Sequence, residues 1–361
     1  MKAKRLFISV IALCCTMVAW AQENDMLTVI LQHEGNATLF IGMNAFINAH
    51  EAAVDGDVIT LSAGKFNLTS ITKKVSVYGA GYEEDAETGT GVTSLLKWNG
   101  YDMMIGKTGE VLKNVHLEGL RIESNLNVAT STAGQTNPVE NLTVSKCYIT
   151  GNISFNNDIT NVDVSQCVIT GGVSGGAAYL ATNLTISNCY IGTLVRTFKT
   201  ESSVLIDHCI IGEGFYHDDG CAESPFTWQN CIFLLDSWNH HNVGYGAYAY
   251  NNLFPNFERN IPGSANCENN YELTPGASIF TDANDGKYAP GRTFTISNPT
   301  LWVGNDNTEV GINGGIGFSR VPATPVVKNL SATVDGKKLI VNFQTNVRPG
   351  STTNPDPEPE P

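Results

Sequence analysis

The sequence predicts an all-β protein, a right-handed parallel β-helix with a short N-terminal capping helix, because one short phrase recurs along the chain. The phrase Asn-Leu-Thr-Val-Ser-Lys-Cys-Tyr-Ile begins at Asn141, and close variants begin at Asn161 and Asn183. Looser copies surround Cys209 and Cys231, so that five cysteines recur at intervals of 20, 22, 20 and 22 residues. A fixed period of this length indicates a repeat architecture. The main rival, a leucine-rich repeat, lacks support because its Leu-rich consensus is absent.

Polarity inside the phrase alternates as in a strand with one buried face. Apolar residues lie five and three positions before each cysteine and two positions after it, with polar residues between them. The cysteine itself is three positions from its preceding apolar neighbour, so one extra residue bends the chain between two short strands. That bend position holds Lys146, Gln166, Asn188, His208 and Asn230. Repeats stacked in register would lie about 4.8 Å apart, and the handedness rule for parallel connections favours a right-handed coil.

Two files of like residues follow from this alignment. The cysteine position, occupied by Leu120 before the five cysteines and by Asn252 after them, should point inward and take a small, compact filler. Free, buried thiols are expected there, because stacked side chains that point the same way suit disulfide geometry poorly. Cys221 and Cys267 lie off this file, and the sequence leaves open whether they pair. An asparagine file, formed by Asn114, Asn141, Asn161 and Asn183, should hydrogen-bond from repeat to repeat.

Residues 1–21 have the features of a secretory signal peptide. Lys2, Lys4 and Arg5 precede an apolar run, and small residues lie before a predicted cut at Gln22. The run is too short for a membrane span, and no later run is apolar enough for one. The sequence therefore predicts a secreted, cell-surface or periplasmic protein without a transmembrane segment.

The chain is acidic, with a formal net charge of −14, and removal of the signal peptide would make it more negative. This charge argues against nucleic acid and anionic membrane surfaces as partners. Polyanionic polymers would also be repelled, because the basic residues are scattered. A solubilising role for the charge is the simpler interpretation.

Met43 to Val54 has helical periodicity just before the first strand of the repeat region. Phe46, Ala49 and Ala53, with Ile47 and Val54 as weaker candidates, should face inward. Such a helix would cover the open end of a solenoid. His50 and Glu51 on the same helix are expected to be solvated.

Residues 52–66 (AAVDGDVITLSAGKF) and 75–81 (VSVYGAG) resemble the opening coils of pectin-lyase-like right-handed β-helix proteins, in which an amphipathic helix caps the first coil. The likeness continues through residues 114–122 (NVHLEGLRI) and covers residues 40–320. The resemblance implies the fold. It does not imply one activity, because the family contains lyases, hydrolases, epimerases and members without known activity.

Four segments are expected in order: the signal peptide at residues 1–21, the β-helix with its cap at residues 22–320, a short β segment at residues 321–348 and an acidic, Pro-rich tail at residues 349–361. Residues 255–320, rich in Gly, Asn and Pro, should form the last irregular coils. Two strand-like runs in residues 326–347 resemble the start of an immunoglobulin-like sandwich, but are too short to complete one.

Titratable and aromatic side chains are densest between Asp207 and Tyr250, where loops would project from a rigid stack. Candidate catalytic residues are Asp207, Asp218 and Asp219, since paired carboxylates perform acid–base work in glycoside hydrolysis. Candidate ligand-binding residues are Tyr216, His217, Trp238, His240, Tyr245 and Tyr248. His208 is expected simply to occupy its bend, and no metal site or cofactor is predicted. Ca²⁺ is a possible ligand that no motif indicates, since residues 282–286 lack the spacing of a calcium loop.

Two hypotheses follow. The first is an exported β-helix that binds carbohydrate or serves as a structural surface module, with a polysaccharide or glycan as partner and no catalysis. The second is a polysaccharide lyase or glycoside hydrolase with its site in residues 207–241. The first is favoured because no catalytic motif of the kind that the resemblance implies is visible around Arg196 and Lys199, the nearest basic residues upstream of the candidate site.

Overall fold

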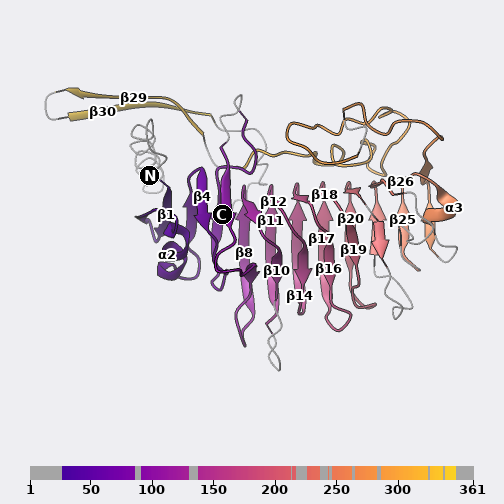
Figure 1. Cartoon of the computed structure of the whole chain (residues 1–361), viewed down its shortest axis with the longest axis horizontal. Coiled ribbons are helices and arrows are strands. Elements are labelled where there is room, and N and C mark those ends of the chain that lie inside the picture. The colour runs from indigo at the N-terminus through magenta and orange to yellow at the C-terminus, as the bar shows by residue number, and fades with distance from the viewer. Residues whose placement is uncertain are drawn as a thin grey trace, which may run out of the picture.

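The computed structural model describes residues 27–85, 91–129, 137–212, 214–216, 226–235, 243, 246–261, 265–282, 286–323, 326–335 and 338–346. Over these residues the structure is mostly β, and their strands form three long sheets, here called A, B and C, to which successive repeats contribute strands. The strands stand side by side along one axis (Figure 1). This is an all-β arrangement consistent with a parallel solenoid.

Sheet A has twelve strands, which in spatial order are β2 (Asn36–Ile41), β1 (Thr28–His33), β3 (Val58–Leu61), β5 (Ser76–Tyr78), β8 (Leu112–Glu118), β11 (Val139–Ser145), β14 (Ile159–Ser165), β17 (Ala181–Ser187), β20 (Val204–Asp207), β23 (Phe226–Gln229), β25 (Tyr248–Tyr250) and β27 (Asn266–Glu268). The strands from β3 to β27 pair in parallel. Strand β1 is antiparallel to both of its neighbours, β2 and β3.

Sheet B has ten parallel strands, which in spatial order are β4 (Gly64–Asn67), β6 (Thr93–Leu96), β9 (Arg121–Glu123), β12 (Tyr148–Ile149), β15 (Val168–Ile169), β18 (Tyr190–Ile191), β21 (Ile210–Ile211), β24 (Ile232–Phe233), β26 (Leu253–Phe254) and β28 (Tyr271–Glu272). Sheet C has six, namely β7 (Met103–Ile105), β10 (Leu126–Val128), β13 (Ile153–Phe155), β16 (Val173–Gly175), β19 (Leu194–Arg196) and β22 (Gly214–Tyr216). Strands β29 (Val326–Asp335) and β30 (Lys338–Asn346) form a separate antiparallel pair, where the sequence predicts two strand-like runs.

The register of the sheets agrees with the alignment of the phrase. Leu142 pairs with Val162, and Val162 pairs with Leu184, so each apolar position stacks on its equivalent in the next repeat. All five cysteines are free thiols and fully buried, as expected, and Leu120 and Asn252 are buried in the same file. The interior is therefore a continuous apolar core that runs the length of the stack.

Both polar files have the predicted geometry. The five bend residues have φ between 48° and 56°, the left-handed conformation that lets the chain turn from sheet A into sheet B. The asparagine file also has positive φ, and Asn Nδ2 donates to the Oδ1 of the preceding repeat over 2.8 Å (Asn141 to Asn114), 3.1 Å (Asn161 to Asn141) and 3.0 Å (Asn183 to Asn161). Asn tolerates this backbone conformation better than most residues.

Helix α2 (Ala45–Ala52) lies with β1 at one end of the stack, and the short helix α3 (Phe257–Asn260) lies at the other (Figure 1). Phe46, Ala49 and Ala53 are buried as predicted, whereas Val54 is exposed because the helix ends before it. The expectation for His50 was wrong: its side chain is buried, and Nε2 accepts a hydrogen bond from the Thr72 N–H over 3.2 Å. No helix in the described part of the chain is long and apolar enough to cross a membrane.

The prediction that residues 255–320 form the last irregular coils is confirmed for β27 and β28 but is wrong for the residues that follow them. The last coil ends at β28, and residues 273–282 and 286–323, here called the return segment, do not add further coils. They run back along the stack towards its N-terminal end, as the orange-to-yellow trace in Figure 1 shows. Apolar residues of the return segment cover the outer face of sheet B and form a second core there with Val168, Tyr190, Ile210, Ile232 and Leu253.

Candidate functional site

The return segment is attached along the file of bend residues, here called the bend file, which includes Gln166, Asn188, His208 and Asn230. Each contact joins a side chain of the coils to the return segment. Coils nearer the N-terminus contact later residues of the return segment, because the two run in opposite directions. Asn251 Nδ2 donates to Val303 O over 3.2 Å, Asn188 Nδ2 to Gly314 O over 2.7 Å, and Gln166 Nε2 to Gly317 O over 2.7 Å. At the far end, the Ala323 N–H donates to Glu118 Oε1 over 2.8 Å.

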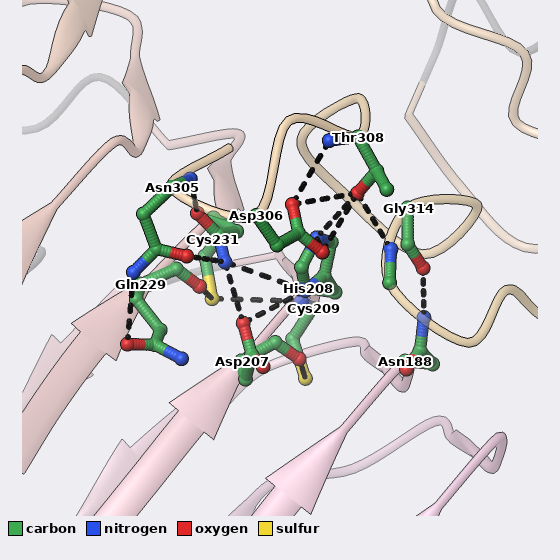
Figure 2. Close-up of polar contacts among 12 residues, drawn as sticks. Asn188, Asp207, His208, Cys209, Gln229, Cys231, Asn305, Asp306, Thr308 and Gly314 are labelled. Carbon is green, nitrogen blue, oxygen red and sulfur yellow. Dashed lines mark hydrogen bonds and ion pairs between the residues drawn. The ribbon is translucent and has the colours of Figure 1, made fainter. Parts of the chain in front are cut away.

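The densest polar cluster of this line surrounds His208 (Figure 2). Nδ1 of His208 lies 2.8 Å from Asp207 Oδ1, on the adjoining end of β20. Nε2 lies 3.1 Å from Thr308 Oγ1 and 3.5 Å from Asp306 Oδ2, both on the return segment. The imidazole thus lies between a carboxylate of the coil and a carboxylate of the return segment, and only 2% of the residue is exposed.

Asn230, in the next bend, extends the cluster. Its Nδ2 donates to Asp207 Oδ1 and to Asn305 Oδ1, each over 2.9 Å, and its Oδ1 accepts from the Asn305 N–H over 2.9 Å. The Gly311 N–H donates to the main-chain oxygen of Asn230 over 2.7 Å. Asn230 is therefore tied to the return segment through both its side chain and its main chain.

The order Asp207–His208–Thr308 resembles the carboxylate–imidazole–hydroxyl relay of nucleophilic enzymes, but the hydroxyl is engaged elsewhere. Thr308 Oγ1 lies 2.8 Å and 3.0 Å from the two carboxylate oxygens of Asp306, to which it can donate, and it accepts from the Gly315 N–H over 2.7 Å. His208 is also covered by the return segment, so no substrate can reach it in this structure. The cluster fastens one segment to another.

Electrostatics of Asp306 agree with that role. Burial alone would raise the pKa of Asp306, but hydrogen bonds from the N–H and hydroxyl of Thr308, with the charge of His208, outweigh it and hold the pKa below its usual value. Asp306 is therefore charged at neutral pH, where it accepts these bonds.

The close approach of the return segment also depends on Gly314. A Cβ atom built at this position would lie 1.8 Å from Glu309 O and 2.4 Å from Cδ2 of His208. No other residue type fits there without moving the return segment away from the imidazole.

The outer face of sheet A is a second feature with functional potential. One file of outward residues contains His116, Thr143, Asp163, Thr185, Leu205, Thr227 and Tyr248, and the neighbouring file contains Glu118, Ser145, Ser165, Ser187, Asp207, Gln229 and Tyr250. Near the C-terminal end of this face the Tyr248 and Tyr250 rings stack with centroids 6.2 Å apart and planes inclined by 22°. The Tyr248 ring is half exposed.

Near the N-terminal end of the same face, Tyr78 lies against His116 with ring centroids 5.1 Å apart. Burial alone would raise the pKa of Glu118, but it is lowered by hydrogen bonds from His116 and the Ala323 N–H and by the Lys146 ammonium. Burial raises the pKa of Asp163, although a hydrogen bond from Ser165 partly offsets it. Glu118 is thus a paired anion, and its charge is not free to repel a ligand.

The structure locates only some of the residues that the sequence singles out. Asp207 projects outward from β20 as predicted, but it contacts His208 and Asn230 rather than a second catalytic carboxylate. Tyr248 lies on the outer face of sheet A, with β23 between its strand and that of Asp207. Tyr216 lies on β22 in sheet C. The candidates outside the described residues are His217, Asp218, Asp219, Trp238, His240 and Tyr245; Cys221 is also outside them, whereas Cys267 is a free thiol.

Sequence reasoning missed the partners of His208, because Asp306 and Thr308 are about a hundred residues away. A signal for a covering segment was present in the phrase itself. The residue after each cysteine, which the strand pattern directs outward, is Tyr148, Val168, Tyr190, Ile210 or Ile232. An outward file of such apolar residues needs a cover.

Among the described residues, no group of three or more His, Cys, Asp and Glu side chains is arranged to hold a metal ion. Comparison with known proteins adds no relative: no protein-family model, curated protein or solved structure matches this chain.

Proposed function

We propose that this protein is an exported right-handed parallel β-helix of the pectin-lyase-like kind, with α2 capping its N-terminal end, and that it binds carbohydrate or serves as a structural surface module without catalysis. The observation that carries the proposal is the outer face of sheet A, with its polar files and the stacked pair Tyr248–Tyr250. The location outside the cytoplasm rests on the signal-peptide pattern of residues 1–21.

The chemistry of this face suits an uncharged sugar chain. Tyrosine rings offer apolar surfaces for the C–H faces of sugar rings, and their hydroxyl groups can bond to sugar hydroxyls. Ser145, Ser165 and Ser187 add a row of hydroxyls that repeats from strand to strand. The net charge of −14 disfavours uronate polymers.

The absence of catalysis is supported by the contacts that the Asp207 carboxylate already makes within the protein. Its carboxylate contacts the imidazole of His208 and the amide of Asn230. A general acid or base must instead be within reach of a proton on the substrate. In the described part of the chain, this candidate catalytic residue thus contacts the two coil residues, His208 and Asn230, that bind the return segment.

Binding is tested by affinity electrophoresis through gels that contain neutral polysaccharides or, separately, a polyuronate. We expect retardation by at least one neutral polymer, and a loss of retardation in Tyr248→Ala and Tyr250→Ala. Tyr101→Ala is the matched control, because Tyr101 is an exposed tyrosine away from sheet A. Equal retardation of all three variants would place the binding elsewhere.

The alternative, a lyase or hydrolase with its site in residues 207–241, is tested on the same polymers by measuring reducing ends and the absorbance of unsaturated uronates. Turnover that disappears in Asp218→Ala or Asp219→Ala would overturn the proposal. Export is tested separately by sequencing the N-terminus of the secreted chain, which we expect to begin at Gln22.

A further inference from the structure

We propose that two copies of this chain associate head to head through strand β2, so that sheet A continues from one molecule into the other. Strand β2 is the first strand of sheet A in spatial order and pairs only with β1 among the described strands. In an antiparallel pair, about half of the N–H and C=O groups of each strand point away from the partner. Among the described residues, these groups of β2 form an open edge six residues long.

The edge lacks the features by which proteins prevent pairing with a second chain. Natural edge strands are protected by charged side chains, proline, bulges or short length. Strand β2 has the sequence Asn-Ala-Thr-Leu-Phe-Ile, with neither charge nor proline, and pairs with β1 in unbroken register over all six residues. The chain as a whole carries 21 basic and 35 acidic side chains, but β2 carries none of them.

Apolar side chains gather beside this edge. Ile41, at the end of β2, is 57% exposed, and Met43, two residues later, is 49% exposed. Leu39 and Phe40 are only half buried. An antiparallel copy of β2 would lay Leu39 and Phe40, near the middle of the strand, against the middle of the other copy. It would place Ile41 against the opposite end of that strand, so apolar surface would be removed from water.

Charge and symmetry favour a second copy in the antiparallel orientation. The nearest carboxylate on the β1–β2 connection is Glu34, just before β2. When two β2 strands run antiparallel, the two Glu34 side chains lie at opposite ends of the shared ladder and do not repel each other closely. A twofold axis through the pair uses the same surface on both molecules, so the assembly closes as a dimer.

The opposite end of sheet A is a poorer partner. Strand β27 is only three residues long, and Glu268 and Glu272 lie in the last coil. Pairing of β2 with β27 would also join molecules head to tail and would produce open-ended filaments. The head-to-head dimer therefore uses the longer, uncharged edge twice.

The test is sedimentation velocity of the full chain over a wide range of concentrations. We expect a monomer–dimer equilibrium, and we expect Thr38→Lys to raise the dissociation constant by roughly tenfold or more, since like charges would face each other across the pair. Thr38 is exposed, and circular dichroism would verify that the variant folds; Ala37→Lys, at a second exposed position, serves if it does not. The matched control is Asn266→Lys on β27, which should dimerise like the wild type.

Three outcomes would overturn the inference. The first is a wild-type chain that stays monomeric at every concentration. This includes a chain in which another of its own segments covers β2, as protection of the β2 amides from hydrogen exchange would reveal. The second is a dimer that Thr38→Lys and Ala37→Lys leave unchanged. The third is a growing series of polymers that Asn266→Lys abolishes, which would identify head-to-tail assembly.

Discussion

Acidification should destabilise the protein through His50, because this imidazole is buried in its neutral form. Burial, with a smaller contribution from the Lys73 ammonium, lowers the pKa of His50 from 6.5 to about 4. The folded state therefore binds fewer protons than the unfolded state between these two pH values. Stability contributed by the neutral imidazole is complete above pH 6.5, falls as the pH decreases, and levels off below about pH 4.

The pKa difference corresponds to a loss of about 3 kcal/mol over this range. Urea unfolding of the wild type and of His50→Gln, followed by circular dichroism at neutral pH and at pH 4, measures it. Glutamine can accept the hydrogen bond from Thr72 but does not titrate, and all carboxylates are common to both proteins. The difference between their pH dependences thus isolates His50. If both proteins lose stability in parallel, the assignment of a buried neutral imidazole is wrong.

Three further changes test other parts of the fold. Gly314→Ala should force the return segment away from His208 and cost about 1–3 kcal/mol, seen as faster limited proteolysis within residues 302–323; an unchanged cleavage rate would contradict the close contact. Burial raises the pKa of Cys147, Cys167, Cys189 and Cys209. The five stacked cysteines should therefore react with a thiol reagent only after unfolding, as peptide mapping would reveal. Asn161→Ala should cost about 1–2 kcal/mol and Asn161→Gly less, because glycine adopts positive φ without strain; equal melting temperatures for the two would refute the role of the backbone conformation.

The periodic parts of the chain were the parts that the sequence could predict. Strand alternation, the bend and the inward cysteines each recur, so that an error in one repeat is corrected by the others. The bend was predicted from one extra residue before each cysteine, and the positive φ at Lys146, Gln166, Asn188, His208 and Asn230 confirms it. The asparagine file was likewise predicted from recurrence alone, and its hydrogen bonds are present.

Features that occur once could not be found in this way. The return segment lacks a repeat, and its contacts join residues that are distant in sequence, such as Glu118 and Ala323. His50 lies on a helix with predictable inward residues, but its burial depends on Thr72 and Lys73, which approach from the next coil. Candidate residues in the loops after Tyr216 carried no periodic signal, and the chemistry assigned to them rests on residue type.

The path of the return segment changes how the stack should fold and unfold. In a simple repeat array each repeat contacts only its neighbours, so the array can fray from one end while the rest stays folded. Here Gly291 donates its N–H to Glu83, 208 residues earlier, and Ala323 contacts Glu118 across 205 residues. Loss of one end removes the attachment of the other, which makes unfolding more nearly all-or-none. Because these contacts need the last residues of the region, a chain that emerges N-terminus first completes its fold only when the return segment docks.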